Sequence, residues 1–204
     1  MQYTLNKIYS DYANVHQICR EVLDVSNQSA IEAVLIDGSL LGMVRDGGFL
    51  PWDDNLDFSV NASHLTHSIH ILEQLLPKML EITGVTWTLN KHINQQAFGA
   101  VPMGEIRALK LLPDDDFGAF PCIDFFIKYI QGDHMDYCLA SRGFRMPAKH
   151  FSNLESHTFA GGLVYLPANV EAYLEGHYGD WQIPQKKWSL SDVKSATVFK
   201  SHSL

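Results

Sequence analysis

The sequence has few cysteines and no excess of basic residues. Its three cysteines, Cys19, Cys122 and Cys138, are odd in number and widely spaced among 204 residues. This pattern favours reduced thiols over a disulfide framework. Lysine and arginine number 15 against 23 acidic residues, which gives a formal net charge of −8. Because a phosphate backbone requires a basic surface, this balance argues against a nucleic-acid partner.

Long apolar runs are also missing. No run approaches the roughly 20 residues that cross a bilayer, and the first residues, MQYTLNK, lack the apolar region of a signal peptide. We therefore expect a cytoplasmic protein without a transmembrane segment.

What is present is the composition of an ordinary globular protein. Apolar residues make up 46% of the chain and charged residues 19%. A chain of this length buries roughly 70% of its unfolded surface when it folds as one unit. We expect a single domain over residues 1–204, with a core at about 12–188 and a polar C-terminal tail.

A short strand carrying acidic residues is the most informative stretch. Asp53, Asn55 and Asp57 alternate with apolar residues up to position 60, so the polar side chains share one face. Carboxylates that lie close together repel unless a cation lies between them. Mg²⁺ fits such a group, since it binds one or two carboxylates together with water and phosphate oxygens. The alternative is an acidic turn before an ordinary strand.

A glycine turn precedes this strand by fewer than twenty residues. The apolar run 33–36 leads into Asp37-Gly38-Ser39 and a short helical stretch to Arg45. Gly38 lets the backbone approach a ligand closely, and Ser39 can cap the helix, whose N-terminus favours anions. The pattern predicts a phosphate-binding turn beside a metal-binding strand.

A third acid lies inside the apolar strand predicted at 122–130. Asp124 shares a face with Cys122, Phe126 and Lys128, whereas the apolar residues between them point the other way. An acid in such a run must be paired or bound to a metal, because burying an unpaired charge is costly. Asp124 is therefore the candidate third member of the site.

The remaining elements define the fold class. Periodicity predicts helices at 12–25, 62–82 and 167–174, strands at 85–89 and 106–112, a hairpin at 158–166, and an acidic hairpin tip at 114–116. Residues 132–139 break the pattern and predict a partly exposed loop. The basic cluster Arg142, Arg145, Lys149 and His150 is either a solvated stretch or a contact for an anion. We expect an α+β fold with a mixed sheet flanked by helices, which cover one face.

Four blocks of this sequence resemble one known family. Gly38-Ser39 with LLG after it, Arg45, and residues 51–57 (PWDDNLD) resemble the signature of LicD and fukutin-type transferases. Residues 121–126 are similar to the third-acid strand of that family, and residues 166–184 to its C-terminal signature. The resemblance implies a nucleotidyltransferase-type (polymerase-beta-like) fold.

The resemblance also implies an activity. Members transfer a phospho-alcohol, such as phosphocholine or ribitol phosphate, from a CDP-linked donor to a hydroxyl of a glycan or glycolipid acceptor, with Mg²⁺ or Mn²⁺ as cofactor. Carried onto this chain, it assigns catalysis to Asp57, Asp124 and Arg45, donor-phosphate binding to Gly38, Ser39 and Arg45, and metal binding to Asp53, Asn55, Asp57 and Asp124. Asp124 is then either a metal ligand or the base that accepts the acceptor's proton.

One departure from the family pattern concerns Asn55, where the family usually has aspartate. An amide oxygen binds Mg²⁺ without bringing charge, so the affinity for metal should fall. Two alternatives to the phosphotransferase remain open: a small-molecule nucleotidyltransferase that uses an NTP, and a member that binds nucleotide or sugar without catalysis.

Overall fold

The computed structural model describes residues 12–28, 32–50, 52–114, 119–139, 142–159, 161–185, 189, 192–193 and 199–200. Asp115 and Asp116 of the predicted hairpin tip, and most of the predicted polar tail, lie outside the described residues.

The described residues form the following helices and strands in chain order. They are α1 (Tyr12–Gln28), β1 (Val34–Leu35), α2 (Asp37–Leu41), the π-helical η1 (Gly42–Asp46), β2 (Asn55–Asn61), the 3-10 helix η2 (Ala62–His64), α3 (Leu65–Thr83), β3 (Trp87–Ile93), β4 (Ile106–Pro113), β5 (Cys122–Gln131), β6 (His134–Leu139), β7 (Arg142–Pro147), the 3-10 helix η3 (Ala148–Phe151), β8 (Glu155–Phe159), β9 (Gly162–Leu166), α4 (Val170–Tyr178) and β10 (Phe199–Lys200).

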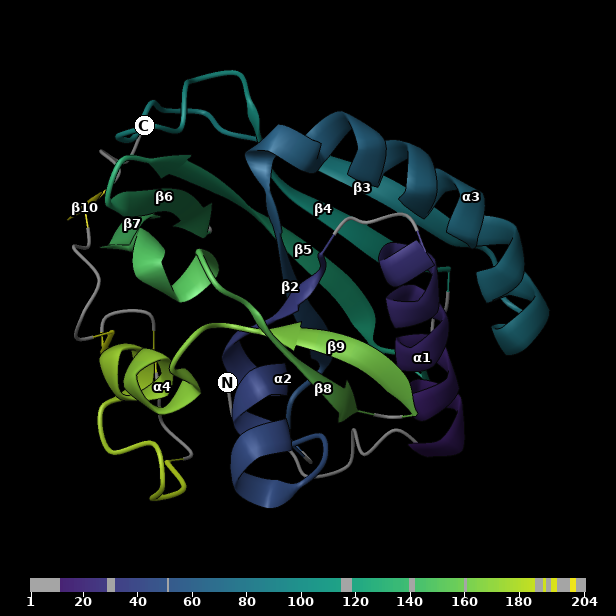
Figure 1. Ribbon diagram of the computed structural model, residues 1–204. Coiled ribbons are helices and arrows are strands. Elements are labelled where there is room, and N and C mark those ends of the chain that lie inside the picture. The colour runs from purple at the N-terminus through teal and green to yellow at the C-terminus, as the bar shows by residue number, and fades with distance from the viewer. Residues whose placement is uncertain are drawn as a thin grey trace.

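A mixed sheet organises these elements (Figure 1). Its strand order is β10-β7-β6-β5-β2-β1-β9-β8, with β4 also paired to β5 and β3 to β4. The pairs β2–β5 and β1–β9 are parallel, and the other pairs between named strands are antiparallel. The α+β prediction with a mixed sheet flanked by helices is confirmed.

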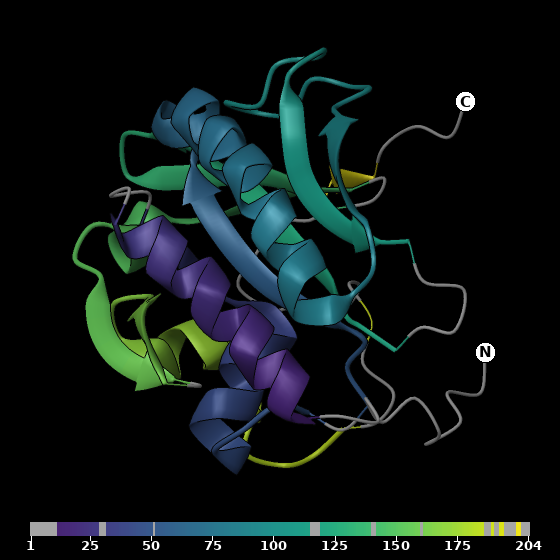
Figure 2. The same cartoon turned by 90° about the vertical axis from the view of Figure 1, so that its right-hand side faces the viewer.

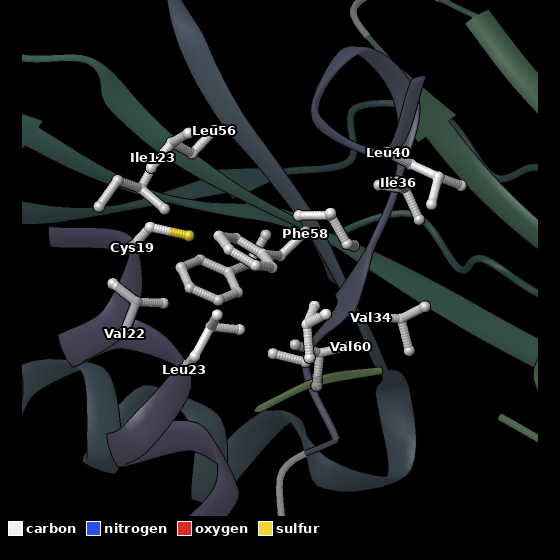
Figure 3. Packing of buried hydrophobic residues seen from close by; sticks show 14 of the residues in the cluster. Cys19, Val22, Leu23, Val34, Ile36, Leu40, Leu56, Phe58, Val60 and Ile123 are labelled. Carbon is white, nitrogen blue, oxygen red and sulfur yellow. The ribbon is translucent and has the colours of Figure 1, made fainter. Parts of the chain in front are cut away.

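Helices α1 and α3 lie side by side on one face of this sheet (Figure 2). In the core between them and the strands, Cys19 and Leu23 of α1 pack toward Phe58 and Ile123 (Figure 3). The Phe58 and Phe125 rings stack with their centroids 5.4 Å apart. The apolar alternation of β2 and β5 therefore faces the helices, and their polar side chains point to the opposite face.

Helix α4 departs from the expectation that the helices cover one face of the sheet. It lies on the other side of the sheet from α1 and α3 (Figures 1 and 2) and contacts α2. The chain enters it through Asn169, which has a left-handed φ of 53° and whose side-chain Oδ1 accepts a hydrogen bond from the Ala172 N–H at 3.3 Å. Within the described residues, no helix combines the length and apolar character needed to cross a membrane.

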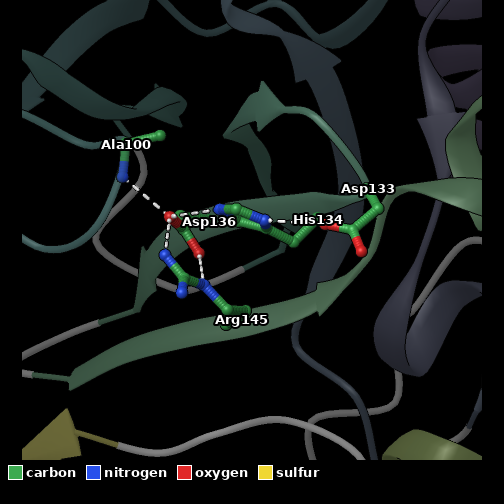
Figure 4. A network of polar contacts seen from close by, with 5 residues as sticks. All are labelled: Ala100, Asp133, His134, Asp136 and Arg145. Carbon is green, nitrogen blue, oxygen red and sulfur yellow. Dashed lines mark hydrogen bonds and ion pairs between the residues drawn. The ribbon is translucent and has the colours of Figure 1, made fainter.

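The prediction of a loop at 132–139 is wrong for His134–Leu139, because these residues form β6, which pairs with β7; residues 132–133 form a turn. The polar residue that obscured the strand pattern is Asp136, which is fully buried and accepts two hydrogen bonds from Arg145, at 2.7 and 2.8 Å. The Ala100 N–H donates a third hydrogen bond at 2.7 Å, and the His134 Nε2 lies 3.8 Å from the Asp136 Oδ2 (Figure 4). Arg145, one of the predicted anion contacts, is thus paired with this buried acid, while its own side chain is 39% exposed.

We expect Arg145→Met to lower the Tm by on the order of 5 °C or more, since it leaves the buried Asp136 carboxylate without its charged partner. Burial alone would raise the pKa of Asp136, but the hydrogen bonds from Arg145 and from Ala100 hold it below its usual value. The charge of Asp136 is therefore stabilising at neutral pH and loses this effect as the pH falls through the lowered pKa. In thermal melts, the difference in Tm between Arg145→Met and the unmodified protein should be largest at neutral pH. Lys149→Met, which removes an exposed cation nearby, is the matched control, and equal melting of the two variants would contradict the prediction.

Candidate active site

Two acids from distant parts of the sequence lie side by side on the polar face of the sheet. Asp57 of β2 is in register with Asp124 of β5, and Asp124 is in register with Lys110 of β4. The Lys110 Nζ lies 2.5 Å from the Asp124 Oδ2. We call Asp57, Asp124 and Lys110 the cross-strand row. Asp57 and Asp124 are 6% and 2% exposed, so their charges interact in a region of low dielectric.

The amide of Asn55 lies between the two carboxylates. Its Nδ2 donates to the Asp57 Oδ1 at 2.7 Å and to the Asp124 Oδ2 at 3.3 Å. An N–H pair thus occupies the position between two negatively charged groups. The strand alternation brings Asn55, Asp57 and Asp124 onto one face, and the structure shows that they contact one another.

The glycine turn is joined to β2 through the backbone of Asp57. The Asp57 N–H donates to the Ser39 Oγ at 2.9 Å, and the Asp57 carbonyl oxygen accepts from the Ile36 N–H at 3.1 Å. A Cβ atom on Gly38 would collide with the Asp53 carboxylate. Gly38 is therefore required for Asp53 to pack over the turn, and Ser39 fastens the turn to the acidic strand.

Asp37 is an acid of this site that sequence reasoning read only as part of the turn. It has a left-handed φ of 49°, a conformation that aspartate tolerates better than most residues. Its Oδ1 is buried and lies 3.5 Å from the Nε2 of His177, which is itself fully buried in α4. The left-handed backbone is set by the fold, so no sequence signal distinguishes Asp37 from an ordinary turn residue.

Burial and mutual repulsion act strongly on these acids. Burial raises the pKa of Asp57 well above its usual value, and the charges of Asp37, Asp53 and Asp124 raise it further, whereas Lys110 lowers it. Burial and the charge of neighbouring Asp54 raise the pKa of Asp53 to about 7. The site therefore favours the arrival of positive charge.

Two lysines were missed as site residues. Lys110 joins Asp124 through strand register, which the sequence does not reveal. Lys128 of β5 is fully buried, and its Nζ lies 3.2 Å from the centroid of the Tyr137 ring, with no hydrogen-bond partner among the described residues. Burial lowers the pKa of Lys128 to about 8, although the charges of Asp37 and Asp57 act to raise it.

Arg45 is placed differently from the acids. Its guanidinium donates two hydrogen bonds, each of 2.8 Å, to the Asp46 carboxylate and lies 5.9 Å from the centre of the Trp52 ring. Its side chain is only 9% exposed. Among the contacts of the described residues it has no hydrogen bond to Asp57 or Asp124, so its predicted roles in catalysis and phosphate binding remain predictions.

The donor atoms suit a hard cation that arrives with further ligands. Carboxylate and amide oxygens are what Mg²⁺ and Mn²⁺ prefer. No three histidine, cysteine or acidic side chains among the described residues form a ready metal-binding group. Asp57 and Asp124 fit a cation that brings its own oxygens, such as those of a diphosphate, and rotation of the Asn55 amide would turn its oxygen toward that cation.

Asp53 should make stability depend on pH near neutrality. Its pKa is about 7 in the folded protein and about 3.9 in an unfolded chain. Between these values the folded state binds a proton that the unfolded state has lost, so stability falls as the pH rises. The contribution of Asp53 to the free energy of unfolding is fully present below about pH 4 and is lost as the pH rises through 7.

Denaturant titrations in EDTA at pH 5 and pH 8 test this expectation. Asp53→Asn should lose less stability between the two pH values than the unmodified protein, by about 1 kcal/mol or more. Asp24→Asn, which removes an exposed carboxylate on α1, serves as the control. An unchanged pH dependence in Asp53→Asn would contradict the prediction.

An α+β sheet with acids in register on neighbouring parallel strands, joined to a Gly-Ser turn, agrees with the nucleotidyltransferase-type domain that the sequence resemblance implies. The chain belongs to the LicD family, since the family model "LicD/FKTN/FKRP, nucleotidyltransferase domain" matches residues 30–169. The family resemblance predicted from the motifs is thereby confirmed.

A curated relative is similar over most of the chain. It is the uncharacterized protein RP689 of Rickettsia prowazekii (strain Madrid E), 21% identical over 196 residues, which are 94% of this chain and 59% of the relative. The chain thus spans about three fifths of the relative's length.

Proposed function

We propose that this chain transfers a phospho-alcohol from a CDP-linked donor to a hydroxyl of a glycan or glycolipid, with Mg²⁺ or Mn²⁺ as cofactor. The single observation that carries the proposal is the contact set Asp57–Asn55–Asp124, formed across parallel strands beside the Gly38-Ser39 turn. Phosphoryl transfer needs chiefly positioning and neutralisation of charge, and these residues supply fixed oxygen donors for a cation bound to phosphate.

The chemistry assigned to the site is a single displacement at phosphorus. The acceptor oxygen forms a bond to the phosphorus that carries the alcohol, and the bond from that phosphorus to the bridging oxygen breaks, so CMP leaves with the electron pair. Asp57 and Asp124 would hold the cation, which would neutralise the charge of the diphosphate. The hydroxyl proton passes to a carboxylate of the site, which is Asp124 if Asp57 and Asn55 hold the cation without it.

The net charge of −8 fits small-molecule and glycan substrates better than nucleic acid. An acidic protein repels an anionic donor, so the binding site must supply positive charge. A cation that binds together with the donor supplies this positive charge.

A second candidate is a member that binds donor without turnover. The observation that favours it is the Asn55 amide, which donates hydrogen bonds to both carboxylates and so occupies the position between them without a metal. Such a protein would bind the nucleotide and release it unchanged.

Product analysis tests the proposal. The protein is first screened for thermal stabilisation by CDP-choline, CDP-ribitol, CDP-glycerol and NTPs, with and without Mg²⁺, because a bound ligand raises the Tm. The stabilising donor is then incubated with candidate acceptors. Release of CMP supports the phosphotransferase, release of pyrophosphate from an NTP identifies a nucleotidyltransferase, and binding without product identifies the second candidate.

A further inference from the structure

Lys110 lies where the cross-strand row meets solvent. Its side chain is 28% exposed, against 3% for the side chain of Asp124. Its cross-strand neighbour on the other side, Asn90 of β3, is exposed. Exposure therefore falls along one line of the sheet from Asn90 through Lys110 to Asp124, and the row opens to solvent at the ammonium group.

The ammonium of Lys110 also has N–H donors beyond the one that contacts Asp124. It carries three N–H donors, of which the contact with the Asp124 Oδ2 uses one. The site's other two cations are placed differently: Arg45 is bound to the Asp46 carboxylate, and Lys128 is fully buried. Of these three cations, Lys110 is the one that both contacts an acid of the row and reaches solvent.

We propose that Lys110 is a donor-binding residue, which contacts an oxygen of the donor's diphosphate while it remains paired with Asp124. This inference rests on the proposed function and adds a residue to it. A lysine ammonium binds phosphate as a point charge and needs no fixed approach direction. The pairing with Asp124 holds that charge beside the carboxylates, where the cation bound to the diphosphate would also lie.

A counter-ion that only neutralises Asp124 makes the opposite prediction. Removing such a counter-ion leaves Asp124 more negative and improves the binding of a divalent cation, so binding of a nucleotide with its cation improves or stays the same. Removing a phosphate contact also improves cation binding by the free protein, but weakens nucleotide binding. The sign of the change in nucleotide affinity separates the two roles.

The test is calorimetric titration of the whole chain. Mg²⁺ alone, CDP in saturating Mg²⁺, and inorganic pyrophosphate in saturating Mg²⁺ are titrated into the unmodified protein, Lys110→Met and Lys110→Arg. We expect Lys110→Met to bind Mg²⁺ alone at least as tightly as the unmodified protein, and CDP and pyrophosphate about tenfold or more weakly. Lys110→Arg should recover most of the loss. If Lys110→Met does not fold, Lys110→Gln, which keeps an N–H donor for Asp124, takes its place.

Lys91→Met is the matched control. Lys91 lies on neighbouring β3 and pairs with Glu73 of α3 at 3.2 Å, on the opposite face of the sheet. This variant should bind CDP as the unmodified protein does. Equal CDP affinity in Lys110→Met and the unmodified protein, or tighter binding in Lys110→Met, overturns the proposal.

Failure of the proposed function gives a different result. If the unmodified protein binds pyrophosphate but not CDP, the CDP-linked donor is wrong, and the pyrophosphate titrations still support or overturn the phosphate contact of Lys110. If it binds neither probe, the inference about Lys110 is overturned as well.

Discussion

Asp57→Asn should reduce turnover by about a thousandfold or more, the scale of losing the several kcal/mol that a bound cation supplies to charge stabilisation. The same substitution should leave the protein as stable as before, or more stable, at pH 7.5 in EDTA. Asparagine keeps the shape of the side chain and the backbone bonds to Ser39 and Ile36. It removes a carboxylate whose ionised form is disfavoured by burial and by three neighbouring acids.

Initial rates of CMP release and thermal melts of the same preparation check this expectation. Asp54→Asn is the control, because Asp54 lies in the same segment but is exposed, and its rate should stay within a few-fold of the unmodified protein. Should Asp57→Asn bind donor and Mg²⁺ as the unmodified protein does, the assignment of Asp57 to the cation would be wrong.

Asn55→Asp should tighten the binding of Mg²⁺ to the free protein by about a hundredfold. A third carboxylate beside Asp57 and Asp124 adds an attraction of a few kcal/mol for a divalent cation at an effective dielectric of about 20. Without metal the substitution exchanges two hydrogen bonds for repulsion between carboxylates. The variant should therefore melt lower than the unmodified protein in EDTA and gain more from excess Mg²⁺.

Titration of Mg²⁺ into both proteins measures the effect, and Asn61→Asp provides the same chemical change at the other end of β2. Equal affinities for Asn55→Asp and the unmodified protein would show that position 55 is not a ligand. Turnover then separates the two candidate functions. A moderate change in rate indicates an enzyme adapted to asparagine, whereas new activity in Asn55→Asp indicates a member that had only bound its ligand.

Sequence patterns predicted the parts of the fold that follow from strict alternation. In β2 and β5 every second residue faces α1 and α3, so the polar face that holds Asn55, Asp57 and Asp124 could be predicted from the sequence. The helices α1 and α3 were predicted for the same reason. These elements are decided by local periodicity and by one apolar core.

The rest depended on partners that lie far away in sequence. Strand β6 was missed because Asp136 looks like a loop residue until Arg145 and the Ala100 N–H are seen to surround it. Lys110 reaches the site through the register between β4 and β5. Asp37 joins it through a left-handed backbone. Register and backbone handedness are set by tertiary packing, which periodicity does not record.

The parallel pairing of β2 with β5 also determines when the site forms during synthesis. Asn55 and Asp124, which contact each other, are 69 positions apart, and a parallel pair requires the whole crossover between them to be in place. A nascent chain that has released β2 but not β5 exposes acids without their strand partner. Ordering such a distant contact is slow compared with forming local helices. The candidate site is therefore complete only after the crossover between β2 and β5 has closed.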